Sequence, residues 1–415
     1  MNVLLLLRVN SGLNLDRWKT SSTPATLKLV EAINSSEYAS DSSLLFLAKS
    51  FDSRIRNQIK ETNFGGDLNN LRCGIVPFFS PKFFPRILGV LFNEIIQCIV
   101  VLKAATSNKP DVVYADRGNL VQAWLLAHLG FSVVWRCLGV MPYVERMESS
   151  RFSMRMLHKL DLIWLNAPFK KIICTLDGSP WELIFTNSDQ LKKLIILPNG
   201  CNVIKKSEDG STLKELLNIS KNLTVISVVG RLICNKHQYE IIKSLIKLKN
   251  IGFNFVVLIV GYGPDKDAII KLIEKDNCKD VIRFIGRVSH NDVLSYFNIS
   301  DISINLSEGG ALGNVSLEAL SSSNCLITLG VDKERHINES ISNFIPDNAY
   351  FRVDRNNIGK DIEILMSEIL SDREKLNQIK SNGIRFFKSK ILTWEQRIDI
   401  DISTLKNVAH LKSNG

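Results

Sequence analysis

Short apolar runs alternate with longer stretches of helical periodicity along most of the chain. The first series of apolar runs is Val3–Val9, Leu44–Ala48, Val112–Ala115, Val133–Cys137 and Ile172–Thr175. The second series is Val225–Gly230, Phe255–Val260, Val281–Ile285, Ile302–Leu306 and Cys325–Leu329. Because helical stretches of about ten residues or more separate most of these runs, the pattern predicts parallel strands with helices on both faces of each sheet.

The turn-forming sequence Pro-Asn-Gly at 198–200 separates the two series. We therefore expect two doubly wound α/β domains, one over residues 1–197 and one over 223–388, joined by a linker at 198–222. Residues 389–415 are predicted to form a helix that returns to the first domain. Since parallel sheets bind ligands at the carboxyl ends of their strands, we expect the site in a cleft between the domains.

Composition and cysteine spacing indicate an ordinary soluble protein. Hydrophobic residues make up 45% of the 415 residues and charged residues 23%, which excludes a disordered, collagen-like or small disulfide-bonded chain. The closest of the eight cysteines, Cys73 and Cys98, are 25 residues apart, so there is no C-x-x-C pair. The apolar start of the chain is too short for a signal peptide, and polar residues interrupt the apolar stretch Ile87–Ala105. We therefore expect a cytoplasmic protein without a membrane span.

The positive charge is concentrated in the first half of the chain. The formal net charge is +10, and residues 1–200 contribute +7 of it, with 23 basic and 16 acidic side chains. This excess favours an anionic partner such as membrane lipid, an acidic glycan or nucleic acid, and a generic soluble surface is the alternative. Because no nucleic-acid-binding motif accompanies the charge, we expect no nucleic-acid partner.

Two cations follow the first strand of the second series. The strand ends at Gly230, Arg231 follows directly, and Lys236 comes five residues later, where a helix is predicted to begin. Two cations beside a helix N-terminus favour a diphosphate site. Two solvated charges on a loop are the alternative.

A glycine-rich loop follows the strand Ile302–Leu306. Its glycines are Gly309, Gly310 and Gly313. They would let the backbone approach a ligand and leave amides for phosphate oxygens. The next helix begins at Asn314 and carries Glu318, whose carboxylate can accept hydrogen bonds from a ribose diol. An ordinary carboxylate near a helix N-terminus is the alternative for Glu318.

Together, these segments resemble the donor-binding half of the family 4 retaining glycosyltransferases, which have the GT-B fold of two Rossmann-like domains. The matching pieces, in the family's order over residues 195–330, are LPNG, GRLICNK, VGYGP, IRFIGRV and SEGGALGNVSLEAL. The N-terminal half matches more loosely, through KPDVVYA and its strand pattern. The resemblance implies a nucleotide diphosphate sugar donor and a hydroxyl acceptor.

The resemblance implies a role for each matching residue. Arg231 and Lys236 would bind the donor diphosphate and stabilise it as it leaves, and Glu318 would hold the nucleotide ribose. Arg287 and Val288 would line the base pocket. The remaining donor contacts, chiefly through backbone amides, would come from Gly310, Gly313, Asn314 and Val315.

The chain departs from the family pattern at two places beside the donor. The family usually has two glutamates eight residues apart, but Gly310 stands eight positions before Glu318 and Glu308 stands ten positions before it. Either the loop has two extra residues and Glu308 takes the place of the first glutamate near the donor sugar, or that carboxylate is missing. His237 replaces the glycine that commonly follows Lys236.

The acceptor side is less well defined, because no histidine stands where the family often places one. We predict that Asp116, at the end of a strand, contacts the acceptor hydroxyl as a catalytic group. Arg117 and Arg136 either bind an acceptor phosphate or order a loop. Gly12, after the first strand, would let the backbone approach the donor.

We expect no metal and no cofactor. Asp265 and Asp267 fit carboxylates in the first turn of a helix, and Asp399 and Asp401 fit surface charge, so neither Asp-x-Asp pair resembles a metal site. Two cations and a helix dipole would take over the electrostatic role of a metal ion.

The segment Ser150–Lys171 contains a basic, amphipathic helical pattern. Its apolar stripe is Phe152, Met156, Leu160 and Ile163, and its basic residues include Arg151, Arg155 and Lys159. Such a helix either lies on an anionic membrane surface or packs its stripe against its own sheet.

The resulting hypothesis is a metal-independent, retaining hexosyltransferase that moves a sugar from a nucleotide diphosphate to a glycan or lipid-linked acceptor. The expected acceptor is a bacterial surface glycan such as lipopolysaccharide, O-antigen or capsule, used at the inner face of the cell membrane. The alternatives are a sugar-nucleotide epimerase of the same fold and a non-catalytic partner subunit of a glycosyltransferase complex.

Overall fold

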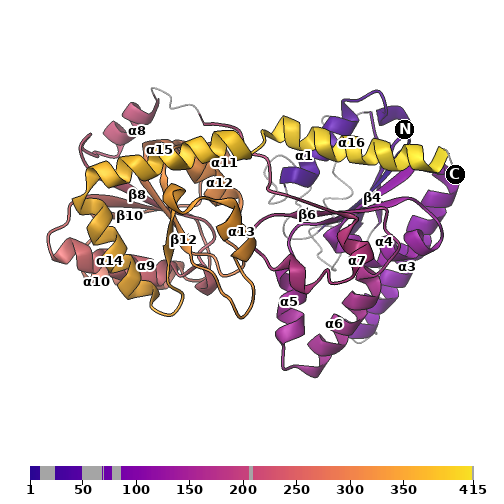
Figure 1. Ribbon diagram of the computed structural model, residues 1–415, viewed down its shortest axis with the longest axis horizontal. Helices are drawn as coiled ribbons and strands as arrows, with labels where there is room; N and C mark the ends of the chain where they lie inside the picture. The colour runs from indigo at the N-terminus through magenta and orange to yellow at the C-terminus, as the bar shows by residue number, and fades with distance from the viewer. Residues whose placement is uncertain (10–23, 49–67, 69, 77–85, 205–208, 414–415) are drawn as a thin grey trace. The chain divides into compact units, whose positions relative to one another are not determined.

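The computed structural model describes residues 1–9, 24–48, 68, 70–76, 86–204 and 209–413 (Figure 1). The chain forms two compact units, and each is described by itself. The first consists of Met1–Thr175, Trp181–Leu197 and Trp394–Gly415, and the second of Leu176–Pro180 and Pro198–Thr393. The C-terminal helix therefore belongs to the first unit, and the short segment 176–180 belongs to the second.

The first unit is built on a seven-stranded parallel sheet. Its strands are β1 (Val3–Val9), β2 (Ser43–Ala48), β3 (Arg72–Val76), β4 (Val112–Asp116), β5 (Val133–Cys137), β6 (Lys171–Thr175) and β7 (Leu194–Leu197). They lie in the order β3-β2-β1-β4-β5-β6-β7. The chain winds outward from the neighbouring strands β1 and β4 in opposite directions, which makes a topological switch point between their carboxyl ends.

Helices cover both faces of this sheet (Figure 1). They are α1 (Pro24–Asn34), η2 (Ala39–Asp41), α3 (Arg86–Asn108), η4 (Arg117–Asn119), α4 (Leu120–His128), α5 (Met141–Glu148), α6 (Phe152–Leu165), η5 (Trp181–Leu183), α7 (Ser188–Leu191) and α16 (Trp394–Ser413). α1 and α16 pack on the face that carries Leu5 and Leu7, while α3, α4, α5 and α6 pack on the face that carries Leu4 and Leu6. Because alternate residues of a strand point to opposite faces, burial on both sides explains the unbroken apolar sequence of β1.

A buried ion pair fastens α16 to the first sheet, and a second pair within α16 shares its carboxylate. Arg136 on β5 donates from Nη1 to Asp401 Oδ2 at 2.6 Å, and Arg397 donates from Nη1 to Asp401 Oδ1 at 2.5 Å. All three side chains are almost fully buried. The interpretation of Asp401 as surface charge is therefore wrong, because periodicity within one helix does not reveal an arginine that lies 265 positions away.

The second unit is built on a six-stranded parallel sheet. Its strands are β8 (Thr224–Val229), β9 (Phe255–Val260), β10 (Ile282–Gly286), β11 (Ile302–Asn305), β12 (Cys325–Leu329) and β13 (Phe351–Val353). They lie in the order β10-β9-β8-β11-β12-β13. This is the strand order of a Rossmann fold, and its switch point lies between the carboxyl ends of β8 and β11.

Helices again pack on both faces of the second sheet (Figure 1). They are α8 (Asp209–Leu216), η6 (Cys234–Lys236), α9 (Gln238–Asn250), α10 (Lys266–Lys275), α11 (His290–Ile299), α12 (Asn314–Ser321), α13 (Glu339–Phe344), η7 (Asp347–Ala349), α14 (Ile358–Ser371) and α15 (Arg373–Lys390). α9, α10 and α14 bury their apolar residues in one core cluster, and α11, α12 and α13 bury theirs in another. The prediction of two doubly wound α/β domains is confirmed.

Near the middle of helix α3, polar side chains are buried while apolar side chains are exposed to solvent. Asn93 and Gln97 are buried, and Arg8 binds Gln97 and Glu94, whereas Ile95 and Ile99 are 59% and 58% exposed. By length and composition, the segment Gly89–Asn108 could also cross a membrane, with a mean hydropathy of 1.5. The polar side chains that interrupt this segment therefore anchor it to the sheet of the first unit.

Candidate functional site

The loop after β8 is held close to the sheet and presents a cation to solvent. Gly230 has a φ of 135°, and a Cβ atom at Gly261 would lie only 1.8 Å from the Gly230 carbonyl oxygen. Gln238 is buried and clamps the loop: its Nε2 donates to the Arg231 carbonyl at 3.0 Å, and its Oε1 accepts from the Ile233 amide at 3.3 Å. The backbone of Arg231 is thus fixed while its side chain is exposed at the switch point.

Lys236 is aimed across the same switch point. Its Nζ donates to Asn305 Oδ1 at 3.4 Å, and Asn305 in turn donates from Nδ2 to Ser316 Oγ at 2.8 Å. Ser316 donates to the Ala311 carbonyl at 2.6 Å. Burial lowers the pKa of Lys236. This chain of hydrogen bonds links the cation to the glycine-rich loop and to the start of α12.

The glycine-rich loop passes very close to the segment 176–180. Gly310 has a φ of 143°, and a Cβ atom there would lie 2.3 Å from the Asp177 carbonyl oxygen. The Leu312 amide donates to that carbonyl at 3.0 Å. Asn338 supports the loop from the other side, because its Oδ1 accepts from the Ala311 amide at 2.8 Å. A side chain at position 310 would therefore displace the loop.

The first turn of α12 begins beside this loop. Gly313 is the N-cap residue, and its side-chain-free Cα faces open space. Asn314 and Val315 follow in the first turn, where helix amides lack intrahelical acceptors. Asn314 Oδ1 accepts from Asn199 Nδ2 at 2.8 Å. Backbone amides at a helix N-terminus form a favourable site for an anion.

Glu318 lies one turn further along α12 and is largely buried, with 13% of its side chain exposed. Burial raises the pKa of Glu318 to about 7. Its Oε1 lies 3.7 Å from Nε2 of the exposed His290 at the start of α11. Arg287 is exposed in the loop between β10 and α11 and follows Gly286, whose φ is 84°. Val288 and Val315 pack against the same apolar cluster.

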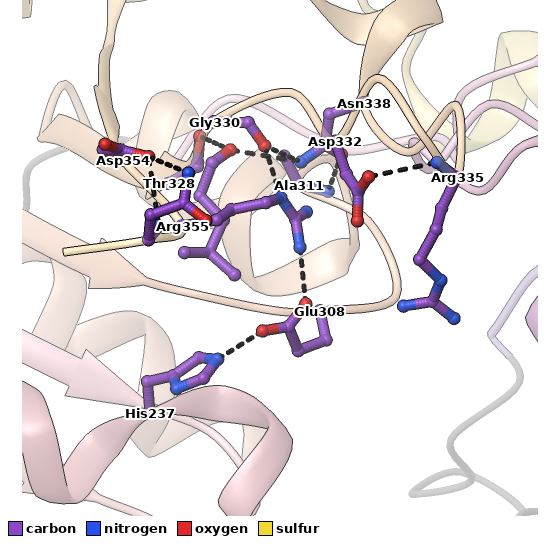
Figure 2. A network of polar contacts seen from close by, with 12 residues as sticks. His237, Glu308, Ala311, Thr328, Gly330, Asp332, Arg335, Asn338, Asp354 and Arg355 are labelled. Carbon is purple, nitrogen blue, oxygen red and sulfur yellow. Dashed lines mark hydrogen bonds and ion pairs between the residues drawn. The ribbon is translucent and has the colours of Figure 1, made fainter. Parts of the chain in front are cut away.

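Glu308 joins three loops at the carboxyl edge of the second sheet (Figure 2). Its Oε1 lies 2.6 Å from His237 Nε2, and its Oε2 accepts from Arg355 Nη1. The Glu308 amide donates to the Asn235 carbonyl at 3.0 Å. Arg355 also donates from Nε to the Gly330 carbonyl at 2.9 Å. The Glu308 carboxylate is therefore held between the loop after β8 and the loop after β13.

In the first unit, Asp116 ends β4 at the switch point, and both of its carboxylate oxygens accept hydrogen bonds. Oδ2 accepts from the Arg8 amide at 2.9 Å, and Oδ1 accepts from the Gly118 amide at 3.0 Å and from Asn119 Nδ2 at 2.9 Å. Burial raises the pKa of Asp116, and these donors oppose the rise. The geometry is that of a carboxylate that orders its loop. Its predicted contact with an acceptor stays a prediction.

Arg117 and Arg136 differ in their surroundings. Arg117 Nη1 donates to the Gly139 carbonyl at 3.4 Å, whereas Arg136 is buried against Asp401. Arg136 therefore has a structural role. The predicted donor contact at Gly12 lies outside the described residues.

No group of three or more His, Cys, Asp or Glu side chains within the described ranges is placed to hold a metal ion.

Most of the predicted donor residues come together at the carboxyl ends of the second sheet, on the loops after β8, β10 and β11 and on α12. The sequence did not reveal their supporting residues, which are Asn305, His237, Arg355, Asn338 and the segment 176–180. Two signals were available: Asn305 ends an otherwise apolar strand, and His237 stands where glycine is common. The other contacts depend on the folded chain.

Residues 211–386 match the family model described as glycosyl transferases group 1. This segment contains β8 to β13 and the loops that carry the candidate donor residues.

Curated relatives match parts of the chain. The alpha-monoglucosyldiacylglycerol synthase of Acholeplasma laidlawii is 27% identical over 159 residues, which is 36% of this chain and 40% of that protein. A glycogen synthase of Mycobacterium tuberculosis is 27% identical over 237 residues, which is 54% of this chain and 53% of that protein. The chain thus spans about half or less of the length of these relatives.

Solved structures match over nearly the whole chain. HepE from Anabaena in complex with UDP has a TM-score of 0.69 at 14% identity and covers 98% of this chain and 100% of its own. A glycosyltransferase from Rickettsia africae has a TM-score of 0.68 at 15% identity and covers 98% of both chains. These likenesses show that the fold, with its two Rossmann-like units, is that of the GT-B glycosyltransferases.

Proposed function

We propose that the protein is a family 4 retaining glycosyltransferase that moves a hexose from a nucleotide diphosphate sugar to a hydroxyl acceptor. The observation that carries the proposal is the arrangement at the β8/β11 switch point. There, Arg231 is exposed on the loop after β8, Lys236 is linked through Asn305 to Ser316 in the first turn of α12, and Glu318 lies one turn into that helix. The match of residues 211–386 to a glycosyltransferase family supports it.

Each residue has a defined task in the proposed reaction. The sugar is attacked by the acceptor hydroxyl on the face from which the diphosphate leaves, and the departing phosphate takes up the hydroxyl proton. Arg231 and Lys236 stabilise the negative charge that grows on the diphosphate. Glu318 accepts hydrogen bonds from the ribose diol, and Arg287 and Val288 line the base pocket. Because cations and helix amides supply this stabilisation, the reaction needs no metal ion.

The proposed acceptor is a lipid-linked surface glycan or a glycolipid. One curated relative is named for the synthesis of a glucosyldiacylglycerol. A solved neighbour with a TM-score of 0.64, covering 96% of this chain and 99% of its own at 13% identity, is WaaG, described as a glycosyltransferase of lipopolysaccharide biosynthesis. Both names support an acceptor that is held at a membrane.

Two helices of the first unit support contact with the cytoplasmic face of an anionic membrane. On α6 the apolar stripe points away from the sheet: Phe152 is 79% exposed, and Met156, Leu160 and Ile163 are exposed as well. Of the basic residues of Ser150–Lys171, Arg155 and Lys159 stand on the same helix, and each contributes about 1 kcal/mol near an anionic surface. The exposed apolar face of α3 adds a second element, and both helices pack on α4.

Thermal-shift measurements test donor binding. The protein is screened against UDP, GDP, ADP, CMP and their sugars, with and without EDTA. A ligand at a hundred times its dissociation constant adds about 2.7 kcal/mol of stability. We expect one nucleotide to stabilise the protein equally in both conditions. If no nucleotide does so, the proposal is refuted and a non-catalytic partner subunit is favoured, whereas conversion of the sugar nucleotide without an acceptor identifies an epimerase.

Substitution of the cations tests their role in turnover. Arg231→Ala or Lys236→Ala should lower turnover by about 10²–10³, which is the scale for loss of an oxyanion-stabilising donor. Lys243→Ala removes a charge from the exposed face of α9 and serves as the control. Near-normal turnover in both site variants contradicts the assignment.

Vesicle sedimentation tests the membrane contact. Wild-type protein should bind vesicles that contain phosphatidylglycerol and not vesicles of phosphatidylcholine alone. The variant Arg155→Glu/Lys159→Glu should lose this binding, while Lys271→Glu/Lys275→Glu on α10 of the second unit should keep it. If both variants lose vesicle binding equally, the binding depends on the net charge of the protein and not on the surface of α6.

A further inference from the structure

Glu308 is the only one of the proposed donor contacts in the second unit, among the residues that the structure describes, whose carboxylate is held by both a histidine and an arginine side chain. His237 comes from the end of the loop after β8, and Arg355 comes from the loop after β13 (Figure 2). The carboxylate remains 32% exposed, so a ligand can still reach it. The two partners therefore fix the direction of Glu308 without covering it.

The backbone at His237 indicates that its side chain has a task. Its φ of 54° and ψ of 26° lie in the left-handed region, which costs a residue with a Cβ more than it costs glycine. A histidine there accepts a strained conformation, and its ring gains a contact of 2.6 Å with Glu308. Strain of this kind persists only where the surrounding structure over-determines it.

Arg355 supplies a rigid second anchor. Its Nε donates to the Gly330 carbonyl at 2.9 Å, which fixes the plane of the guanidinium, and its Nη1 is directed at Glu308. Because the guanidinium is planar, one hydrogen bond to the backbone and one to a carboxylate leave it little freedom. Glu308 follows β11, and the strands that precede its two partners, β8 for His237 and β13 for Arg355, lie on either side of β11 in the strand order.

The charge of Arg355 addresses an electrostatic problem of the site. An ionised carboxylate beside a diphosphate is repelled by it, and opposite charges within about 4–6 Å of the carboxylate reduce that cost. The guanidinium of Arg355 on one oxygen and the ring nitrogen of His237 on the other would allow Glu308 to lie near the phosphates and still accept hydrogen bonds from neutral hydroxyl groups.

We propose that His237 and Arg355 are positioning residues that hold Glu308 as the acceptor of hydrogen bonds from the donor sugar's hydroxyls. This inference rests on the proposed function, because it requires a nucleotide sugar in the site. Glu308 stands two positions further from Glu318 than the family's first glutamate usually does. His237 and Arg355 would hold it in place, and a loop of the usual length would not need them. His237 and Arg355 act on the sugar through Glu308 and not on the diphosphate.

The test separates binding of the sugar from binding of the nucleotide. Dissociation constants are measured by calorimetry for the nucleoside diphosphate and for its sugar derivative, using the nucleotide that stabilises the wild-type protein. His237→Gly should leave diphosphate affinity within about twofold of wild type and weaken sugar-nucleotide affinity by roughly tenfold, the scale of one charge-assisted hydrogen bond. Its melting temperature should not fall, because glycine relieves the left-handed strain.

Two further variants complete the test. His237→Gln keeps a donor at the position of Nε2 and should recover most of the sugar-dependent affinity. Glu240→Gln removes the other carboxylate near the ring, whose Oε2 lies 4.0 Å from His237 Nδ1, and should have no effect.

Each outcome is decisive. If His237→Gly binds both ligands as wild type does, or loses affinity for both equally, His237 does not position Glu308 for the sugar. If wild-type protein binds no nucleotide at all, the proposed function fails first, and the inference fails with it.

Discussion

The buried carboxyl of Glu318 predicts an unusual dependence of stability on pH. Burial raises the pKa of Glu318 from its ordinary 4.5 to about 7 in the folded protein. The folded state therefore holds this proton more tightly than the unfolded state does between those two values. The stabilisation is fully present below about pH 4.5 and is lost as the pH rises through 7.

The size of the effect follows from the shift. One pKa unit corresponds to about 1.36 kcal/mol, so ionisation of Glu318 should cost roughly 3 kcal/mol of folding stability above pH 7. Glu318→Gln resembles the protonated acid and removes this titration. We expect the variant to match wild type near pH 4.5 and to be more stable than wild type by up to about 3 kcal/mol near pH 8.

A bound nucleotide sugar should act in the opposite direction on the same carboxyl. Ribose hydroxyls donate to the ionised form and lower its pKa, so binding should release up to one proton between about pH 6 and 7. Calorimetry in two buffers of different ionisation enthalpy measures that proton. His290 lies 3.7 Å away, so His290→Gln is the control for its contribution.

Parallel pH profiles of wild type and Glu318→Gln in chemical unfolding would refute the reasoning. Such a result would mean that water reaches the carboxylate and that its pKa is ordinary. Proton release that persists in Glu318→Gln would assign the coupling to another group.

Two further predictions concern the architecture that supports the two units. Asp401→Ala should destabilise the protein by about 3–5 kcal/mol, because it leaves Arg136 buried without its counter-charge, and a loss below 1 kcal/mol in urea unfolding would contradict this. Gly261→Ala would place a Cβ 1.8 Å from the Gly230 carbonyl, so it should lower both the melting temperature and nucleotide affinity. The matched control Gly252→Ala, with a φ of 100° and open space around it, should cost only about 1–2 kcal/mol and leave nucleotide affinity unchanged.

The sequence predicts the fold well because most strands are buried on both faces. All ten expected strands are present, and their apolar sequences are long enough to be distinguished from loops. The strands it misses are β3, β7 and β13. Each lies at an edge of its sheet and is only partly buried. Polar residues or a glycine interrupt β3 and β13, whereas β7 is apolar but only four residues long.

The candidate site is predicted only in part, and the division has a physical reason. Arg231, Lys236 and Glu318 follow strands that the pattern defines, so position along the chain is enough to place them at the carboxyl edge of a sheet. Glu308 and Arg355 are 47 positions apart, and their contact depends on how β11 and β13 are ordered in the sheet. No local pattern contains that information.

In the second unit, the ionisable groups that support the fold differ from those of the candidate site in whether an opposite charge of the protein balances them. Asp301 is largely buried, and its Oδ1 lies 2.6 Å from Lys380 Nζ. Burial raises the pKa of Asp301, but Lys380 and the Val225 amide outweigh this effect and lower the pKa. In contrast, burial dominates at Lys236 and at Glu318, lowering the pKa of the first and raising that of the second. Opposite charges that are buried near one switch point could have formed an ion pair. Instead, Lys236 contacts an amide oxygen, and Glu318 lies on a different element. The proposed ligand, with a diphosphate and a ribose diol, would compensate both groups at once, which a protein ion pair would prevent.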